Sequence, residues 1–567
     1  MSVVDKARGW IAHDPDPATR RELEGLIAHN DTEALEDRFA GSLEFGTAGL
    51  RGVLGAGPSR MNRANVIRAT AGLCAWVRRS GTESPTLCVG RDARTMSDVL
   101  ARDTIETALA AGVRVLVLTA VVPTPVVAFA VLDREAAAGV MITASHNPPE
   151  YNGYKVFWGN GAQIIPPNDA GIAEAIERAP GASLVPRISL DEGRQRGLLI
   201  EIDDVRQRYV EVVAGAVGAP GERGPVRVAY TALHGVAEAT VRAVLSNDKH
   251  CTFESVAEQA TPDGMFPTVR FPNPEEPGAM DRVHALCRAM DGDLAIANDP
   301  DGDRLAVTVM HHGSLRQLSG NDIGLLLADD LLRHVEDGAR PLVLSTLVSS
   351  PMLGSIAAHH GARWEQTLTG HKWIQNRALE LEREGFRYVF GYEEALGYAA
   401  LRDVRDKDGI SAARLMIDLA ARLKFEGLTL VDALEVLWRT HGVWVDRQVS
   451  RRFEGVGAMK SASDAIDLMR SAPWTTLGGT RVESMWDLGR QVRWTPAGEL
   501  RDARFPKSEG LILTLEGDHR VMIRPSGTEP KLKYYLYARA TIDGNLADAR
   551  TAAEKLLDRI SADLGLP

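Results

Sequence analysis

Three aspartates stand at alternate positions in the segment NDPDGDR, directly after the apolar stretch LAIA. Asp299, Asp301 and Asp303 must therefore crowd at the C-terminal end of a strand, where three like charges repel one another. A divalent cation relieves this repulsion, and an oxygen-only ligand set favours Mg²⁺ over zinc or copper. Because Mg²⁺ commonly keeps room for a phosphate oxygen, the segment predicts a phosphorylated ligand. A calcium-binding EF-hand loop is excluded, since Met310 stands where its twelfth-position glutamate is required; a plain acidic turn remains the alternative.

A serine follows another apolar run in MITASHNPPEYNGYKVF, on a turn stiffened by two prolines. Ser145 lacks the G-x-S-x-G elbow of lipase-like hydrolases, which leaves phosphoserine chemistry as the sharper interpretation. A phosphate on Ser145 could complete the Mg²⁺ shell of the three aspartates, so that two distant motifs would form one site. Taken alone, Ser-His-Asn at a strand end also fits a turn that hydrogen-bonds its own backbone.

Further segments carry groups suited to phosphate and sugar. The loop in IRPSGTEPKLK combines a guanidinium, hydroxyls and backbone N–H groups, a set that fits a phosphate dianion, although an exposed hairpin tip has the same composition. Glu393 in YEEALGY suits sugar hydroxyls and Lys407 in VRDKDG suits phosphate, while LTGHKW (368–373) forms another turn. A solvated face for Glu393 and an ordinary loop position for His371 are the alternatives.

These segments together resemble the α-D-phosphohexomutase superfamily over essentially the whole chain, in order and in spacing. The matching motifs are FGTAGLRG (45–52), TASHNP (143–148), NGYKV (152–156), DPDGDR (299–304), the Glu-Glu loop (393–394) and RPSGTEP (524–530). FPNPEEPGAMD (271–281) and RPSGTEPKLKYY are similar to the longer-chain branch that contains phosphoglucomutases and phosphopentomutases.

The resemblance implies a mutase that interconverts sugar 1-phosphate and 6-phosphate, most simply those of glucose, through a phosphoserine at position 145. Mg²⁺ on the three aspartates and glucose 1,6-bisphosphate as activator and intermediate belong to this expectation. Phosphomannomutase and phosphopentomutase activities are the alternatives within the family. An aspartyl-nucleophile phosphatase and a non-catalytic sugar-phosphate sensor are the rivals outside it.

The resemblance also assigns roles residue by residue. Arg51 and Lys155 would assist proton and charge shifts, and Lys155 could act as a general base only if nearby cations such as Arg51 depress its pKa. His146 and Arg304 would lie beside the phosphoserine, and Glu393 would bind sugar hydroxyls. The remaining expected substrate ligands are Thr369, Gly370, His371, Lys372, Lys407, Arg524, Ser526, Gly527, Thr528 and Lys531. Relatives usually carry serine where this chain has Ala395, which leaves the preferred sugar open.

The elements that position these residues are strands rich in Val, Leu and Ile, alternating with Ala-rich helical patterns. This alternation is typical of α/β domains. We expect strands at 86–90, 113–119, 139–145, 226–233, 293–299 and 341–348. The apolar run Val115–Leu132 is broken by two prolines, so we interpret it as strand, turn and helix rather than a membrane span.

A chain of 567 residues exceeds one hydrophobic core and predicts several domains. We expect four of them around a central cleft, three related mixed α/β sheet domains and a C-terminal α+β domain that closes over the substrate. The expected ranges are a helical extension at 1–40, then 41–214 with the phosphoserine loop, 215–316 with the metal loop, 317–443 with the sugar loop, and 444–567 with the phosphate loop, with a hinge near residue 444.

Composition limits the possible partners and compartments. A net charge of −11 opposes general binding to nucleic acid or anionic lipid, and no secretory signal opens the sequence. Four scattered cysteines without a C-x-x-C pair predict reduced thiols and a cytoplasmic protein. Small-molecule sugar phosphates are the expected partners, and the chain is expected to be a monomer or a homodimer.

Overall fold

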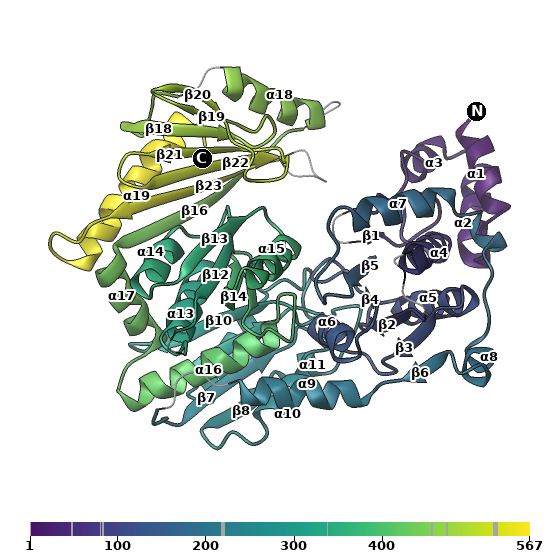
Figure 1. Cartoon of the computed structure of the whole chain (residues 1–567), viewed down its shortest axis with the longest axis horizontal. Helices are drawn as coiled ribbons and strands as arrows, with labels where there is room; N and C mark the ends of the chain where they lie inside the picture. Colours follow the sequence, from purple (N-terminus) through teal and green to yellow (C-terminus); the bar gives the residue numbers. More distant parts are fainter. Residues whose placement is uncertain are drawn as a thin grey trace.

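The computed structural model describes residues 2–46, 49–79, 81, 84–216, 221–336, 338–454, 458–471, 474–525 and 531–566. Four sheets organise this part of the chain, and three of them carry helices in the manner of α/β domains (Figure 1). The fourth, near the C-terminus, is antiparallel throughout its pairings. The expected class, three mixed α/β domains followed by an α+β domain, is confirmed.

Domain I is built on a six-stranded mixed sheet in the order β1-β5-β4-β2-β3-β6. Its strands are β1 Leu50–Val53, β2 Thr86–Arg91, β3 Arg114–Val117, β4 Ala138–Ile142, β5 Tyr151–Trp158 and β6 Leu199–Glu201. Its helices are α4 Arg63–Arg79, α5 Ser97–Ala110, α6 Thr124–Asp133, α7 Asn168–Arg178, α8 Leu190–Gln195 and α9 Asp204–Gly215. The run from Val115 to Leu132 thus forms strand β3, a turn and helix α6, as expected. Helices α1 Val3–Ile11, α2 Pro17–Ala28 and α3 Thr32–Arg38 precede the sheet and share a small core of their own.

Domain II has a five-stranded sheet in the order β11-β10-β9-β7-β8. Its elements are β7 Val226–Thr231, α10 Glu238–Leu245, β8 Cys251–Ser255, α11 Ala257–Ala260, α12 Asp281–Ala289, β9 Leu294–Asn298, β10 Leu305–His311 and β11 Ser314–Gln317. Every residue of β9 is buried, as a strand covered on both faces requires. Strand β9 ends one residue before the first of the three aspartates, so the fold places them at a sheet edge.

Domain III has a four-stranded sheet in the order β13-β12-β14-β15. Its elements are α13 Gly320–Leu332, β12 Pro341–Thr346, α14 Met352–His359, β13 Arg363–Thr367, α15 His371–Arg383, β14 Arg387–Glu393, β15 Gly397–Ala399, α16 Gly409–Phe425 and α17 Leu430–His441. Loops at the carboxyl ends of β13 and β14 carry the predicted sugar-binding residues, which therefore meet at one edge of this sheet.

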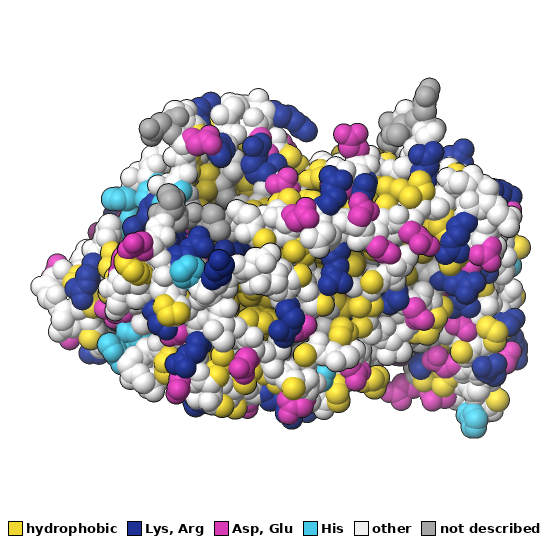
Figure 2. Space-filling model, turned by 90° about the horizontal axis from the view of Figure 1, so that it is seen from below, with side chains coloured by type: hydrophobic (Ala, Val, Ile, Leu, Met, Phe, Trp, Pro, Cys, Tyr) yellow, Lys and Arg dark blue, Asp and Glu magenta, His cyan; other side chains and the backbone are white. Residues whose placement is uncertain are grey.

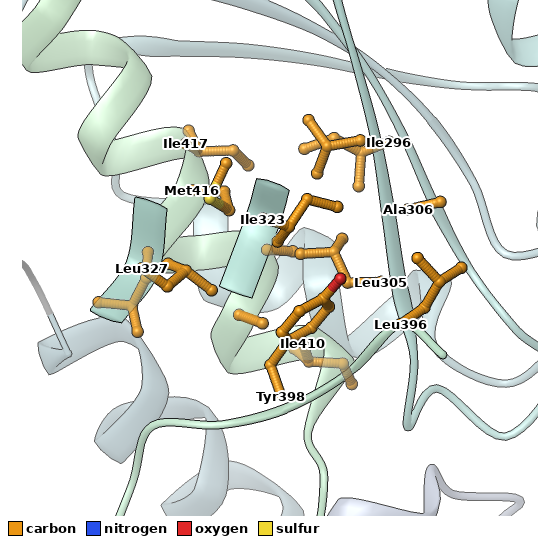
Figure 3. Close-up of a cluster of buried hydrophobic side chains, with 14 of the residues drawn as sticks. Ile296, Leu305, Ala306, Ile323, Leu327, Leu396, Tyr398, Ile410, Met416 and Ile417 are labelled. Atoms are coloured by element: carbon orange, nitrogen blue, oxygen red, sulfur yellow. The ribbon is translucent and has the colours of Figure 1, made fainter. Parts of the chain in front are cut away.

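Domains II and III share one hydrophobic core. Figure 3 shows side chains of α13 and α16 packed against Ile296 of β9 and Leu305 of β10. Ile323, Ile410 and Met416 in this cluster are fully or almost fully buried. Because protein interiors are close-packed, the two domains cannot shift against each other without opening voids in this cluster.

The C-terminal domain has a sheet in the order β16-β23-β22-β21-β18-β19-β20, with β17 paired to β18. Its elements are β16 Val443–Arg452, α18 Ala458–Ser471, β17 Thr476–Leu477, β18 Thr480–Asp487, β19 Val492–Thr495, β20 Gly498–Arg501, β21 Leu511–Leu515, β22 His519–Pro525, β23 Lys531–Ala540 and α19 Leu546–Asp563. One sheet face forms a core with α18 and α19. The other face packs on domain III through a smaller cluster that includes Leu347 and Met522.

The described surface carries charges of both signs, and the thiols are unpaired with one another. On the face seen in Figure 2, Lys and Arg side chains are interspersed with Asp and Glu. All four cysteines are free, and Cys74, Cys88 and Cys287 are buried while Cys251 is partly exposed. Among the described residues, no helix combines the length and apolar character needed to cross a bilayer.

Candidate functional site

The three aspartates meet in one buried cluster immediately after β9. One oxygen of each of Asp299, Asp301 and Asp303 lies within 4.8 Å of the others, and all three residues have no exposed surface. Gly302 adopts a φ of +71°, a left-handed conformation that glycine tolerates best, and this turn separates the second aspartate from the third. This turn therefore helps to bring the three carboxylates together.

The donor set of this cluster fits Mg²⁺. The Oδ1 atoms of Asp301 and Asp303 are buried and have no hydrogen-bond partner within the described part of the chain. Oxygen acceptors left unpaired at the core of a protein are costly, whereas a hard cation coordinates such atoms directly. Burial, followed by the charges of Asp303 and Asp301, raises the pKa of Asp299 well above its ordinary value. This crowding of negative charge is what a bound cation would relieve.

Ser145 lies directly against the aspartate cluster. Its Oγ donates to Asp299 Oδ2 at 3.0 Å, although 154 positions separate the two residues. The backbone of Ser145 has a φ of +55°, which is uncommon for a residue with a side chain and is concentrated at functional sites. Its N–H donates to Thr143 Oγ1 at 2.9 Å, which helps to hold this conformation. The serine and the aspartates therefore form one site, as the motif analysis predicted.

His146 contacts the serine hydroxyl from the other side. Its Nδ1 is 3.2 Å from Ser145 Oγ, and its ring lies 6.3 Å from that of Phe271, centroid to centroid. Burial, with smaller contributions from Arg304 and Arg51, holds the pKa of His146 well below its ordinary value. The predicted neighbours His146 and Arg304 are thus both electrostatically close to the serine.

Lys155 occupies the position predicted beside the metal cluster, but its electrostatics differ from the expectation. Its Nζ lies 2.6 Å from Asp301 Oδ2 and 2.8 Å from Asp303 Oδ2. Burial lowers the pKa of Lys155, but the two aspartates outweigh this effect and place it above its ordinary value. Lys155 could act as a general base only if cations such as Arg51 depressed its pKa, and this condition is not met in the arrangement seen here, because the nearest charges are carboxylates. Lys155 is therefore a charge-stabilising group in this geometry.

Lys407 reaches the same cluster from domain III. Its Nζ lies 2.9 Å from Asp303 Oδ2 and 3.9 Å from Asp406 Oδ1. Burial lowers the pKa of Lys407, but Asp303 and Asp406 more than compensate and raise it strongly. A fixed ammonium at the junction of domains II and III suits a phosphoryl group.

Arg51 and Arg304 complete the positive surroundings. Arg51 is exposed on β1, and the charges of Arg304, Asp301 and Asp303 act on it. The backbone N–H of Arg304 donates to Asp299 Oδ1 at 3.0 Å, and its Nη1 lies 3.4 Å from Glu275 Oε2. Both predicted arginines therefore lie near the aspartate cluster.

The loop that carries Ser145 is held by Arg94, which the sequence motifs did not indicate. Its Nη2 donates to the carbonyl oxygens of Ser145 (2.6 Å) and Asn147 (2.5 Å), and its Nη1 donates to that of Pro148 (2.9 Å). Asp92 lies 3.4 Å from the guanidinium, and both residues are buried. The only sequence signal is the segment GRDAR at the end of β2, which is adjacent to β4 in the sheet.

The predicted sugar-binding residues of domain III lie at the carboxyl ends of two strands. The backbone N–H of Gly370 donates to Glu393 Oε1 at 2.7 Å, which joins the two loops. His371 begins α15 and its Nε2 lies 3.3 Å from the carbonyl oxygen of Gly397. Lys372 Nζ is buried without a hydrogen-bond partner among the residues that the structure describes, and burial lowers its pKa to about 8. The structure therefore brings Gly370, His371 and Glu393 together, whereas the charge that acts on Lys372 is that of Asp169 in domain I.

The predicted phosphate loop lies only partly within the described residues. Arg524 Nη1 donates to Thr369 Oγ1 at 2.5 Å, which links β22 of the C-terminal domain to the turn after β13. Lys531 begins β23 beside this strand. Ser526, Gly527 and Thr528 lie outside the described residues.

Comparison with protein families identifies three consecutive matches in this chain. The phosphoglucomutase/phosphomannomutase α/β/α domain models I, II and III match residues 42–181, 207–313 and 319–440, respectively. The matched ranges cover more than half of the chain. They include the serine loop, the three aspartates and the sugar loops.

Similar proteins match nearly the whole chain. A "Probable phosphoribomutase" of Schizosaccharomyces pombe is 35% identical over 95% of this chain and 94% of its own. A "Probable phosphomannomutase" of Haemophilus influenzae is 37% identical over 84% of this chain and 93% of its own. The crystal structure of a putative phosphomannomutase from Thermus thermophilus has the same fold, with a TM-score of 0.67 at 20% identity, over 93% of this chain and 99% of its own.

Proposed function

We propose that this chain interconverts glucose 1-phosphate and glucose 6-phosphate through a phosphoserine at Ser145. The chain belongs to the phosphoglucomutase/phosphomannomutase family and is therefore a sugar-phosphate mutase. One observation carries the proposal. The hydroxyl of Ser145 lies 3.0 Å from Asp299 within a buried cluster of three carboxylates. A phosphoryl group on that oxygen would lie directly against the cation site.

In the proposed cycle, phospho-Ser145 transfers its phosphoryl group to the free hydroxyl of a sugar monophosphate. The resulting glucose 1,6-bisphosphate turns around in the site, and its other phosphate returns to the serine. Mg²⁺ held by the three aspartates would neutralise charge that develops on the transferred group. The two orphaned carboxylate oxygens of Asp301 and Asp303 support this assignment. Lys155, Lys407 and Arg51 would supply further positive charge around the phosphoryl oxygens.

The sugar would be held by groups of domain III and the C-terminal domain. Glu393, fixed through its contact with the Gly370 N–H, can accept hydrogen bonds from sugar hydroxyls. Arg524 is placed to bind the phosphate that does not react, because it lies at the end of β22 and contacts Thr369. Since either end of the bisphosphate must fit this anchor in turn, the anchor should recognise phosphate rather than the sugar.

A pentose phosphate is the second candidate substrate, and two observations favour it. Ala395 removes a hydroxyl from the sugar loop, and a relative that covers most of this chain is named a probable phosphoribomutase. A single missing hydroxyl contact changes discrimination by only a few kcal/mol. We therefore expect measurable turnover of both classes, with the ratio of kcat/KM values deciding between them.

Two measurements test the proposal. Ser145→Ala should lower kcat for glucose 1-phosphate by roughly 10³-fold or more, because the covalent carrier is lost. Mass spectrometry of the purified protein should locate phosphate on Ser145. Phosphate found on an aspartate, together with release of inorganic phosphate from the substrate, would support the phosphatase alternative instead. Values of kcat/KM for glucose 1-phosphate, mannose 1-phosphate and ribose 1-phosphate, measured side by side, would then identify the sugar.

A further inference from the structure

A second pocket lies between domain III and the C-terminal domain, apart from the site described above. Its volume is about 600 Å³, within the range typical of small-molecule sites. Domain III contributes β13 and the start of α14, and the C-terminal domain contributes the sheet face that packs on domain III. None of the residues assigned above to catalysis, metal binding or sugar binding lines it.

The pocket wall is strongly basic. Four arginines line it, whereas the only carboxylate among its described lining residues is Asp518. Asp518 is already bound to one of the four, at 2.5 Å from Nη1 of Arg539, and Arg504 is paired with Asp502, which does not line the pocket, at 2.7 Å. The arginines are Arg493, Arg504, Arg520 and Arg539. This charge balance favours an anionic occupant.

Arg520 is a buried cation for which the described residues supply no carboxylate partner. Only 9% of the residue is exposed, and no carboxylate in the described part of the chain pairs with its guanidinium. Burial lowers its pKa to about 10. A buried cation without a partner is costly, so natural proteins pair such groups with an anion. Arg520 lines the pocket, where a ligand could supply that anion.

The unsatisfied hydrogen-bonding groups around the pocket are all donors. Four side chains that line it carry a buried N–H for which the described residues provide no hydrogen-bond partner. They are the Nε2 of Gln366, the Nε1 of Trp444, and the Nε atoms of Arg493 and Arg539. The complement of such a set is a ligand rich in acceptor oxygens and poor in donors. Phosphoryl oxygens meet this requirement, and arginine binds them particularly well.

We propose that this pocket binds a phosphorylated small molecule, separate from the substrate, at the junction of domain III and the C-terminal domain. The ligand's oxyanion contacts Arg520 and Arg493, and acceptor oxygens satisfy the N–H groups of Gln366 and Trp444. The site does not depend on the sugar proposed above or on the phosphoserine.

The position of the pocket gives such a ligand a route to the active site. Arg520 and Arg524 lie on the same face of β22, four residues apart, or about 13 Å along a strand. Met522 lies between them and packs in the cluster with Leu347 of domain III. An occupant that contacts both domains would brace the face of the sheet that carries the substrate's phosphate anchor.

Isothermal titration calorimetry with inorganic pyrophosphate, in Mg²⁺-free buffer, tests the proposal without any catalytic step. Arg524→Gln weakens binding at the active site and leaves the pocket intact, so this variant should retain one pyrophosphate site. Adding Arg520→Gln should weaken that site roughly 10- to 100-fold, because a charge-assisted hydrogen bond is lost. Arg481→Gln, an exposed arginine on β18 of the same domain, is the matched control and should change nothing.

Two results would overturn the proposal. One is the absence of pyrophosphate binding in Arg524→Gln, and the other is equal affinity in Arg524→Gln and Arg520→Gln/Arg524→Gln. If the Arg520 variant fails to fold, Arg493→Gln gives the same comparison at a partly exposed position. Since binding alone is measured, inactivity of Ser145→Ala or the choice of sugar has no influence on the result.

Discussion

Replacing Arg94 by lysine should slow catalysis, although Arg94 is not one of the predicted substrate-binding residues. The guanidinium uses Nη2 to hold the carbonyl oxygens of Ser145 and Asn147 at 2.6 and 2.5 Å. Lysine keeps the positive charge beside Asp92 but lacks the planar fork that reaches several carbonyls at once. Loss of one hydrogen bond from a charged donor costs about 1.5–3 kcal/mol. If the serine loop needs that bond in the transition state, kcat falls roughly 10- to 100-fold.

The assay compares initial rates on glucose 1-phosphate with thermal unfolding of the same samples. Arg91→Lys is the matched control, since Arg91 ends the same strand and its guanidinium donates only to the Asp92 carbonyl oxygen, at 3.4 Å, among the described residues. A positioning role predicts a lower kcat with KM nearly unchanged, because phosphate and sugar binding lie elsewhere. A kcat for Arg94→Lys within about twofold of the parent enzyme would refute the reasoning.

Two further perturbations test the electrostatics of the site. Asp301→Asn should weaken Mg²⁺ binding about tenfold or more, because one of three carboxylates is neutralised. Calorimetry without substrate measures this affinity. An unchanged affinity would show that the aspartates do not bind the metal. Glu394→Gln should stabilise the protein at high pH, since burial, followed by the charge of Glu393, raises the pKa of Glu394 to about 8. Because the pKa of Glu394 is raised in the folded protein, the protonated carboxyl is compatible with the fold, and this compatibility is lost as pH rises through about 8. The variant should therefore match the parent near pH 5 and unfold at a higher temperature than the parent near pH 9. Equal melting curves at both pH values would contradict this.

The sequence was sufficient to predict the strand ends at which chemistry occurs. The apolar stretch before Asp299 predicted strand β9, and strand alternation placed the aspartates at its edge. Ser145 could be assigned to the same site because a phosphate on this serine would bind the cation held by the aspartates. No local pattern connects the two segments. The family resemblance supplied the remaining predicted site residues, and their roles stay predictions.

Long-range side-chain contacts were beyond the sequence. Arg94 acts on carbonyl oxygens of a loop about fifty positions away, and backbone acceptors leave no mark in a sequence. The sequence left the pKa of Lys155 open, because it did not show that Asp301 and Asp303 lie within 2.8 Å of the ammonium group. Arg520 is one of many arginines in the chain, and only its burial without a carboxylate distinguishes it.

In the proposed cycle, the common core of domains II and III would limit how a bisphosphate is inverted. Helix α16 begins beside the metal loop, where a side chain on Gly409 would collide with the carbonyl oxygen of Arg304, and its residues up to Ala421 are buried in the core shared with domain II. Asp303 and Lys407 are consequently fixed relative to each other while the sugar rotates. The space for that rotation would come from withdrawal of the C-terminal domain, which has a core of its own and meets domain III through the smaller cluster around Leu347 and Met522. Domains II and III would thus stay fixed relative to each other, and only the C-terminal domain would move.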